Sequence, residues 1–246
     1  MSKLLIETAE RVQLLTLNRP ETKNAFDAEL WSLLRDALNS ASENPDINSV
    51  IVTGASNTFS SGVDLASMVG DGGVNYEVPF ETCIDALINF KKPLIASVDG
   101  IAIGGGATIL LHFDAVFIAP HAKVKYPFSD LGLAPEVGSS LLLFQHLGYQ
   151  KAAQLLFGAE WIGGDEYFDL GLARYVGSDY HDKALSYAHQ LNEQSIASII
   201  ETKKILKTFN ADAITEARNL ETLAMKKLYG SEDNLKAIEK FFARKG

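Results

Sequence analysis

The sequence predicts an α/β protein made of βαβ units with largely parallel strands, followed by a helical C-terminal region. Three short apolar runs at 49–54, 92–100 and 114–120 have the length of buried strands and alternate with stretches of helical spacing. From about residue 129 the pattern is mostly helical. The 246 residues, 47% hydrophobic and 22% charged, supply enough apolar material for a large core. We expect a core over 1–194 and an appended helical region over 195–246.

The N-terminal segment predicts a hairpin and then a capped helix. Residues 3–8 and 11–17 are two apolar-rich runs separated by a short polar stretch. Asp27 is placed to cap a helix over about 28–43, because a carboxylate accepts hydrogen bonds from the first free N–H groups. The apolar positions that give this helix its spacing are Leu30, Leu33, Leu34, Ala37 and Leu38.

The middle of the chain alternates between the two kinds of element. A buried strand is expected at 49–54, a helix at 80–90 and a second strand at 92–100. Three glycines follow, then a helix to about residue 111 and a third strand at 114–120. This alternation is the pattern of a parallel sheet with helical crossovers.

Composition excludes several classes of function. The formal net charge of −9 disfavours binding to nucleic acid, which needs clustered Lys and Arg. The single cysteine, Cys83, allows no internal disulfide, and the five histidines lack metal-ligand spacing, so no metal site is expected. No run reaches the ~18 apolar residues of a membrane span, and the N-terminus lacks a signal-peptide pattern. We therefore expect a cytoplasmic protein with no membrane partner.

The stretch DGIAIGGGATIL, residues 99–110, places Gly104, Gly105 and Gly106 between a buried strand and a helix. Glycine lets a ligand approach the backbone closely, and N–H groups at the start of a helix are unsatisfied. The stretch therefore indicates a main-chain site for an anion or oxyanion, with a tight packing turn as the alternative. A second loop, SVIVTGASNTFSSGVDL, also leaves a buried strand and contains glycine. Two such loops could direct two N–H groups at one oxygen.

Three segments resemble the successive signatures of the crotonase, or enoyl-CoA hydratase/isomerase, superfamily. They are LTLNRPETKNAFDAELWSLLRDAL, SVIVTGASNTFSSGVDL and KPLIASVDGIAIGGGATILLHFDAVFIA. The resemblance implies the crotonase spiral fold of ββα turns with a helical C-terminal region, assembled as a homotrimer or a dimer of trimers. It also implies an acyl-CoA thioester substrate, with coenzyme A as part of that substrate and no separate cofactor. The thioester oxygen would lie between the N–H groups of Val63 and Gly105.

The positions around that oxygen favour one reaction within the family. Members that hydrate a double bond resemble each other in two glutamates, and the matching positions here are Thr108 and Phe128. Instead, YPFSDLGLAPEVGSSLL resembles the PFSxLGxxPEGxSS segment of the peroxisomal-type Δ3,Δ2-enoyl-CoA isomerases, in which one glutamate is acid and base. That residue is Glu136 here, followed by Val137 where glycine is usual. A solvated residue at a helix N-terminus is the alternative for Glu136.

The resemblance also implies which residues contact the substrate. They are Lys23, Asn24, Ala25, Ser61, Asp64, Leu65 and Phe128, with Phe241 and Lys245 completing the site of a neighbouring subunit. We expect an isomerase that moves the double bond of a 3-enoyl-CoA to give a 2-enoyl-CoA. The alternatives are a hydratase, a ring-type acyl-CoA isomerase of the same family, and a non-catalytic acyl-CoA-binding module.

Overall fold

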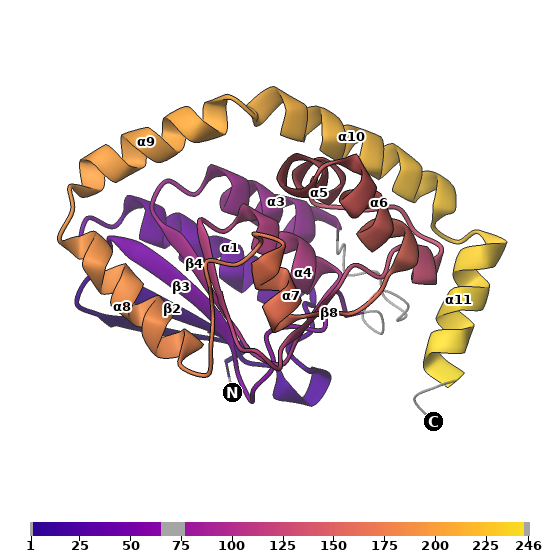
Figure 1. Ribbon diagram of the computed structural model, residues 1–246, viewed down its shortest axis with the longest axis horizontal. Coiled ribbons are helices and arrows are strands. Elements are labelled where there is room, and N and C mark those ends of the chain that lie inside the picture. The colour runs from indigo at the N-terminus through magenta and orange to yellow at the C-terminus, as the bar shows by residue number, and fades with distance from the viewer. Residues whose placement is uncertain (1, 65–76, 244–246) are drawn as a thin grey trace.

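A six-stranded sheet forms the centre of the molecule, in the order β1-β2-β3-β4-β6-β9 (Figure 1). The computed structural model describes residues 2–64 and 77–243, with only the backbone described at 241 and 242. β1 pairs antiparallel with β2 and every other pair in this sheet is parallel, as the alternation of elements predicts. The strands are Leu4–Ala9, Val12–Leu17, Ser49–Gly54, Leu94–Val98, Ala115–Ile118 and Tyr175–Val176.

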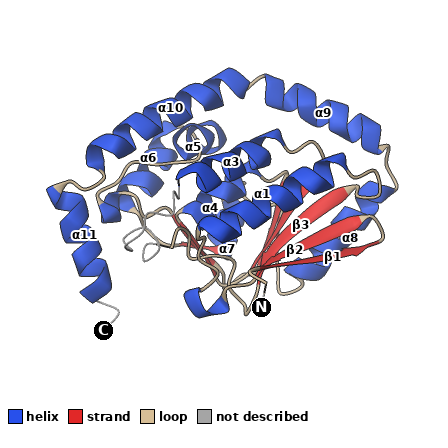
Figure 2. Ribbon diagram, turned by 180° about the vertical axis from the view of Figure 1, so that it is seen from behind, coloured by secondary structure: helices blue, strands red, loops and turns tan. Residues whose placement is uncertain are grey.

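Helices cover both faces of this sheet (Figure 2). α1 (Ala28–Glu43) and α3 (Glu77–Asn89) pack together on one face, and α8 (Tyr180–Asn192) packs on β3, β4 and β6. Burial on both faces explains why the middle strands are continuous apolar runs rather than alternating ones. The predicted cap of α1 is confirmed, because Asp27 Oδ1 accepts a 2.8 Å hydrogen bond from the N–H of Leu30.

A second, three-stranded sheet accompanies the first, as the family resemblance implies, but its individual strands were not predicted from the sequence. It consists of β5 (Ile101–Ile103), β7 (Lys123–Lys125) and β8 (Ile162–Gly163), strands of two or three residues that are too short to show periodicity. Each follows or precedes a strand of the large sheet: β4 leads into β5 and β6 into β7. Ser60, after β3, adds a parallel bridge to Ala102 in β5. The chain thus winds between two sheets, as expected for a spiral of ββα turns.

The helix expected after the glycines is shorter than predicted. α4 is a single turn, Gly105–Thr108, and the chain continues as a 3₁₀ helix over Ile109–His112. The pattern of apolar residues does not distinguish the two helix types over so few residues. Any positive potential at Gly105 therefore comes from individual N–H groups rather than from a long helix dipole.

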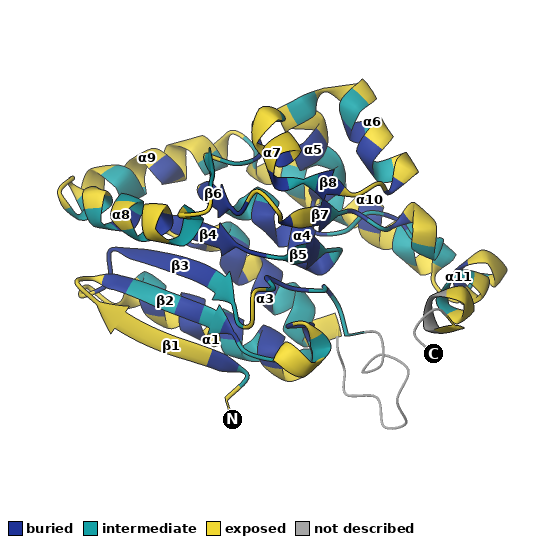
Figure 3. Ribbon diagram, turned by 60° about the horizontal axis from the view of Figure 1, so that its bottom comes forward, coloured by how far each residue is buried: buried dark blue, intermediate teal, exposed yellow. Residues whose placement is uncertain are grey.

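The C-terminal half is helical, and its last three helices lie along the outside of the molecule (Figure 1). Shorter helices precede them: α5 (Ser139–Leu147), α6 (Tyr149–Gly158) and α7 (Gly164–Asp169). Then α9 (Ile196–Thr208), α10 (Ala211–Leu228) and α11 (Glu232–Ala243) form an arc that is largely exposed (Figure 3). α9 begins after its N-cap residue, Ser195, and the domain boundary at 194/195 stays a prediction. None of the helices within 2–64 and 77–243 is long and apolar enough to span a membrane.

Candidate active site

Two loops that leave the sheets side by side form the centre of the site. Ser60 forms a parallel bridge with Ala102 of the small sheet. Val63 lies three residues after Ser60, and Gly105 lies three residues after Ala102. Gly62 has φ +85°, and a Cβ there would lie 2.3 Å from the carbonyl oxygen of Ile103 and 3.3 Å from Gly105 N. Only glycine fits such an approach, so Gly62 brings the two loops together.

Among the described residues, the N–H of Val63 has no main-chain acceptor. In the parallel bridge to Phe26, the N–H of Phe26 donates to Gly62 O at 2.7 Å, and the N–H of Asp64 donates to Phe26 O at 2.9 Å. Val63 lies between these two bonds and takes part in neither. Gly105 is the first residue of α4, where an N–H has no acceptor within the helix. The two groups predicted from the family resemblance therefore lie on adjacent loops with free donor capacity.

The Glu136 carboxyl lies beside Gly105. A Cβ built on Gly105 would be 3.5 Å from Glu136 Oε1, 3.5 Å from Val63 Cγ2 and 3.6 Å from Trp31 Cζ2. These are ordinary van der Waals distances, so the absent side chain leaves a space about the size of one methyl group between the donor and the carboxyl. The structure therefore brings Glu136, Val63 and Gly105 to one place from three separate segments.

The surroundings of Glu136 favour its protonated form. Burial first, and then the negative charges of Glu221 and Glu81, together raise the pKa of the Glu136 carboxyl to about 7. The residue nevertheless keeps an intermediate exposure, so it is reached from outside. A carboxyl that titrates near neutrality can both accept and donate a proton at physiological pH.

An apolar wall borders the space at Gly105. Trp31 of α1 is fully buried, stacks on Phe26 with ring centroids 3.9 Å apart, and meets Phe80 edge-on at 5.3 Å. Sequence analysis missed this residue as a site residue. Its position one residue after Leu30 on the buried face of the helix was a usable signal, but only the packing shows that the ring edge reaches Gly105.

The turn after Glu136 has an unusual backbone. Val137 has φ +65° and Gly138 φ +74°, so two successive residues are left-handed. Valine is disfavoured there because its branched Cβ crowds the backbone, which explains why glycine is usual at this position of the resembled motif. His112 Nε2 bonds Val137 O at 2.7 Å, and burial lowers the pKa of His112 to about 4. The neutral imidazole therefore donates this bond through Nε2–H.

The residues predicted to contact coenzyme A lie beside these loops but differ in exposure. Lys23 is exposed, whereas Asn24 and Ala25 are buried. The Asn24 amide donates to Ala55 O at 2.9 Å and Thr58 O at 2.6 Å, so this side chain holds the loop together. Neither residue offers much surface to a ligand, because Asn24 is fully buried and Ala25 is 5% exposed.

Ser61 and Asp64 also have partners within the protein. The Ser61 hydroxyl donates to Thr22 O at 2.9 Å, and the Asp64 carboxylate is 3.0 Å from Arg19 Nη2. Both side chains therefore stabilise the arrangement of the loops, whatever they contact in addition.

The remaining predicted positions are Phe128, Leu65, Lys245 and Phe241. Phe128 is 5% exposed and belongs to the main hydrophobic cluster. Leu65 and Lys245 lie outside the described residues, and only the backbone of Phe241 is described. Thr108 occupies the first of the two positions at which hydratases carry a glutamate. It is fully buried, and its hydroxyl donates a hydrogen bond to Gly105 O at 3.3 Å. Neither Thr108 nor Phe128 supplies an ionisable group.

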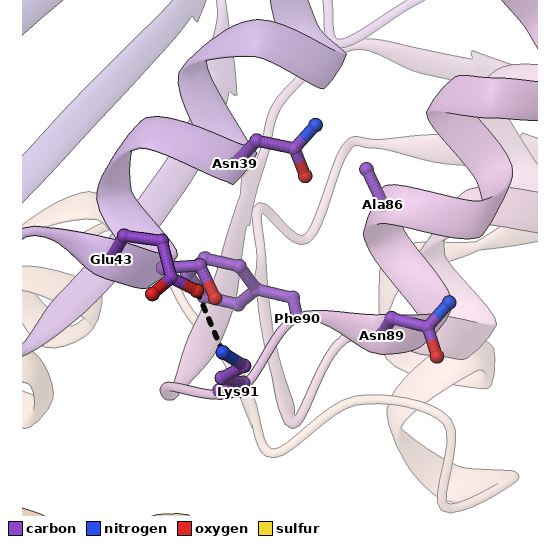
Figure 4. Close-up of a pocket in the computed structure, with 7 residues that line it drawn as sticks. Asn39, Glu43, Ala86, Asn89, Phe90 and Lys91 are labelled. Atoms are coloured by element: carbon purple, nitrogen blue, oxygen red, sulfur yellow. Dashed lines mark hydrogen bonds and ion pairs between the residues drawn. The ribbon is translucent and has the colours of Figure 1, made fainter.

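A separate cleft lies at the far end of α1 and α3. It has a volume of about 290 Å³ and is lined by residues that include Asn39, Glu43, Asn89 and Lys91 (Figure 4). Glu43 and Lys91 form a 2.6 Å ion pair across it. It contains none of the residues described above, so it is distinct from the candidate site. Within 2–64 and 77–243, no group of three or more His, Cys, Asp or Glu residues is placed to hold a metal ion.

Known proteins share both the fold and the family of this chain. The winding of the chain between two sheets, with its helical C-terminal region, is the crotonase fold. A solved enoyl-CoA hydratase/isomerase from Pseudoalteromonas atlantica superposes with a TM-score of 0.94 at 28% identity, over 99% of this chain and 98% of that one. The family model described as "Enoyl-CoA hydratase/isomerase" matches residues 7–246. The chain belongs to the enoyl-CoA hydratase/isomerase family.

Some curated relatives are named as hydratases and others as isomerases. A probable enoyl-CoA hydratase of Rhizobium meliloti is 29% identical over 98% of this chain and 95% of its own length. The peroxisomal enoyl-CoA delta isomerase 3 of Mus musculus is 28% identical over 98% of this chain and 78% of its own length. Similarity therefore indicates an enzyme of enoyl-CoA metabolism and leaves the choice of reaction to the site.

Proposed function

We propose that the protein is an isomerase that converts a 3-enoyl-CoA to the conjugated 2-enoyl-CoA with one carboxyl group as acid and base. The observation that carries this proposal is the carboxyl of Glu136 beside Gly105, while Thr108 and Phe128 occupy the two positions at which hydratases carry glutamates. Adding water needs groups that both position it and exchange protons with it. Neither Thr108 nor Phe128 can accept a proton from water.

The proposed mechanism begins at C2 of the substrate. Glu136 in its carboxylate form removes a C2 proton, and the electrons move onto the thioester oxygen to give a dienolate. The N–H groups of Val63 and Gly105 donate to that oxygen, where charge develops, and act as the oxyanion hole. The protonated Glu136 then returns the proton to C4, the double bond moves to C2–C3, and the carboxylate is regenerated.

The raised pKa of Glu136 suits both steps of this mechanism. A base that titrates near neutrality loses little driving force when it accepts the proton and gives it up readily to the dienolate. Trp31 and Phe26 form an apolar wall on this side, which keeps the effective dielectric constant low and strengthens the oxyanion bonds.

We also propose that the enzyme works as a homotrimer or a dimer of trimers. Large apolar side chains are exposed along the C-terminal helices, and single subunits rarely expose so many on one region. They are Ile205, Leu206, Phe209, Leu220, Leu223, Tyr229 and Leu235. In such an assembly, Phe241 and Lys245 would complete the coenzyme A site of a neighbour, with Lys23 on the subunit's own side.

Hydration of 2-enoyl-CoA is the second candidate, because relatives such as that of Rhizobium meliloti are named as hydratases. The variant Glu136→Gln tests the proposal on 3-enoyl-CoA, since it keeps the shape of the side chain but removes the base. We expect kcat to fall by about 10²–10⁴, with little change in acyl-CoA affinity.

Thr108→Ala is the matched control, because it removes no ionisable group: it takes away a buried methyl and a hydroxyl that makes a 3.3 Å hydrogen bond to Gly105 O. It should retain most of the wild-type turnover. Near-wild-type isomerisation by Glu136→Gln, or a loss in Thr108→Ala as large as that in Glu136→Gln, would overturn the assignment of Glu136.

A further inference from the structure

Glu221 differs from the other acidic residues of α10 because its carboxylate is buried. The residue is 6% exposed, and its oxygens accept hydrogen bonds from the N–H of Gly138 at 2.7 Å, the N–H of Ser140 at 2.9 Å and the hydroxyl of Ser140 at 2.5 Å. A buried carboxylate is tolerated only when it is well hydrogen-bonded, and bonds to an ionised acceptor are among the stronger ones in proteins. These contacts therefore fix Glu221 against the start of α5.

The start of α5 needs an acceptor from elsewhere in the chain. Its N-cap residue is Gly138, which has no side chain and makes no side-chain cap hydrogen bond. Helices begin with N–H groups that lack partners, and normally a Ser, Thr, Asp or Asn at the N-cap supplies one. Here Glu221, more than 80 residues further along the chain, takes that role.

The segment that Glu221 holds is the turn that carries Glu136. The N–H of Ser139 donates to Glu136 O at 3.0 Å, and the two residues between them, Val137 and Gly138, are the left-handed pair. A left-handed valine costs energy and persists only where surrounding contacts hold it. Those contacts are the bond from His112 to Val137 O and the three bonds to Glu221.

Glu221 also differs from its neighbours in charge balance. One turn earlier on α10, Arg218 pairs with Glu81 at 2.6 Å and with Asp85 at 2.7 Å on α3. For Glu221, no ion pair is found within 2–64 and 77–243. The charge of Glu81 is compensated by its ion pair with Arg218, whereas the charge of Glu221 has no such partner among the described residues.

We propose that Glu221 is a positioning residue for Glu136: it fixes the 137–140 turn through the missing cap of α5 and holds a second negative charge close to the base. The first effect sets where the Glu136 carboxyl lies relative to Gly105. The second favours the protonated form, in agreement with the pKa of Glu136, which burial and then the charge of Glu221 raise to about 7. The consequence for turnover rests on the proposed isomerase function.

The test uses Glu221→Gln in the full-length protein, with Glu216→Gln as a matched control. Glu216 lies on the same helix and is exposed. The other charged or titratable groups near Glu136 are Glu81 on α3, Arg218 on α10 and His112 after α4, and both variants leave them in place. The pKa of Glu136 is measured by infrared titration between about pH 5 and pH 9, as the carboxyl band present in wild type and absent in Glu136→Gln.

Glu221→Gln should lower the pKa of Glu136 by roughly half a unit or more, because a like charge is removed from a partly buried site. The acid limb of kcat/KM on 3-enoyl-CoA should move to lower pH by the same amount, and kcat should fall by about tenfold or more as the turn loosens. Glu216→Gln should leave all three quantities at wild-type values. An unchanged pKa of Glu136 in folded Glu221→Gln would overturn the proposal.

Two further arms keep the outcome decisive. If Glu221→Gln does not fold, Glu221→Asp replaces it: the charge stays, so the pKa of Glu136 should remain raised, while the shorter side chain recedes from Gly138 and Ser140 and kcat falls. Wild-type kcat in Glu221→Asp, together with wild-type kcat in Ser140→Ala, would overturn the positioning role. If the wild-type protein does not isomerise 3-enoyl-CoA, the proposed function fails, and the infrared titration still decides whether Glu221 acts on Glu136.

Discussion

Replacing Gly105 by alanine should separate activity from stability. The added methyl would lie 3.5 Å from Glu136 Oε1, 3.5 Å from Val63 Cγ2 and 3.6 Å from Trp31 Cζ2, so it fits without displacing any of them. Gly105 begins a helical turn and its φ is not in the left-handed region, so alanine is compatible with the backbone. The free energy of unfolding should stay the same or rise by up to about 1 kcal/mol.

The same methyl fills the space between the main-chain donor and the base. The reacting thioester carbons must occupy that space to lie between Gly105 N–H and Glu136. Alanine keeps its own N–H, but the methyl prevents the thioester oxygen from reaching it; we therefore expect kcat/KM on 3-enoyl-CoA to fall by roughly 10²–10³, as when the use of one oxyanion donor is lost. In a thermal scan, Tm should stay the same or rise by at most about 3 °C.

Gly106→Ala is the matched control and should behave in the opposite way on stability. A Cβ at Gly106 would lie 2.8 Å from Ser60 Cβ and from Ser60 O, which is backbone and cannot move aside cheaply. This variant should lose about 1–3 kcal/mol of stability. Wild-type kcat/KM in Gly105→Ala, or a stability loss as large as in Gly106→Ala, would refute the placement of the reaction between Gly105 and Glu136.

Three other predictions follow from the same contacts. The pKa of Glu136 is raised from 4.5 to about 7 in the folded protein, so the free energy of unfolding should fall as pH rises through this window. Above pH 7, Glu136→Gln should therefore be up to about 2–3 kcal/mol more stable than wild type. This gain should disappear below pH ~4.5, as measured by urea unfolding. One base serving both carbons should carry part of a deuterium label from C2 to C4 of the product in ordinary water, as mass spectrometry can detect; complete loss of the label would argue for two separate groups. Phe209→Asp, at a side chain 81% exposed on the C-terminal arc, should convert trimers to smaller species in light scattering at micromolar concentration, and a stable wild-type monomer would contradict the proposed assembly.

The fold was predictable where each element is long enough to show its own pattern. The hairpin, the capped helix α1 and the strands β3, β4 and β6 were expected from apolar runs and from Asp27, and the structure confirms them. The strands of the small sheet were missed because β5, β7 and β8 have two or three residues each and are defined by pairing between distant segments. The length of α4 was wrong for a related reason, since one turn of α helix and a 3₁₀ helix share the same apolar pattern.

The candidate site divides in the same way. Val63, Gly105 and Glu136 were found through motifs, because the motif positions carry information that composition does not. Trp31 and Glu221 were missed since their roles arise only when α1 and α10 pack against the loops. Asn24 and Ala25 were expected to line the ligand, and this stays a prediction; both are buried, and the Asn24 amide donates to the carbonyls of residues 55 and 58.

The most direct test of the proposed reaction compares two substrates on the purified wild-type protein. A 3-enoyl-CoA and a 2-enoyl-CoA of equal chain length are followed by the ultraviolet absorbance of the conjugated thioester. With the Glu136 carboxyl beside Gly105 as the base, the absorbance should rise with the 3-enoyl substrate, and the 2-enoyl substrate should not lose absorbance by hydration. Rapid hydration of the 2-enoyl-CoA without isomerisation of the 3-enoyl-CoA would contradict the account.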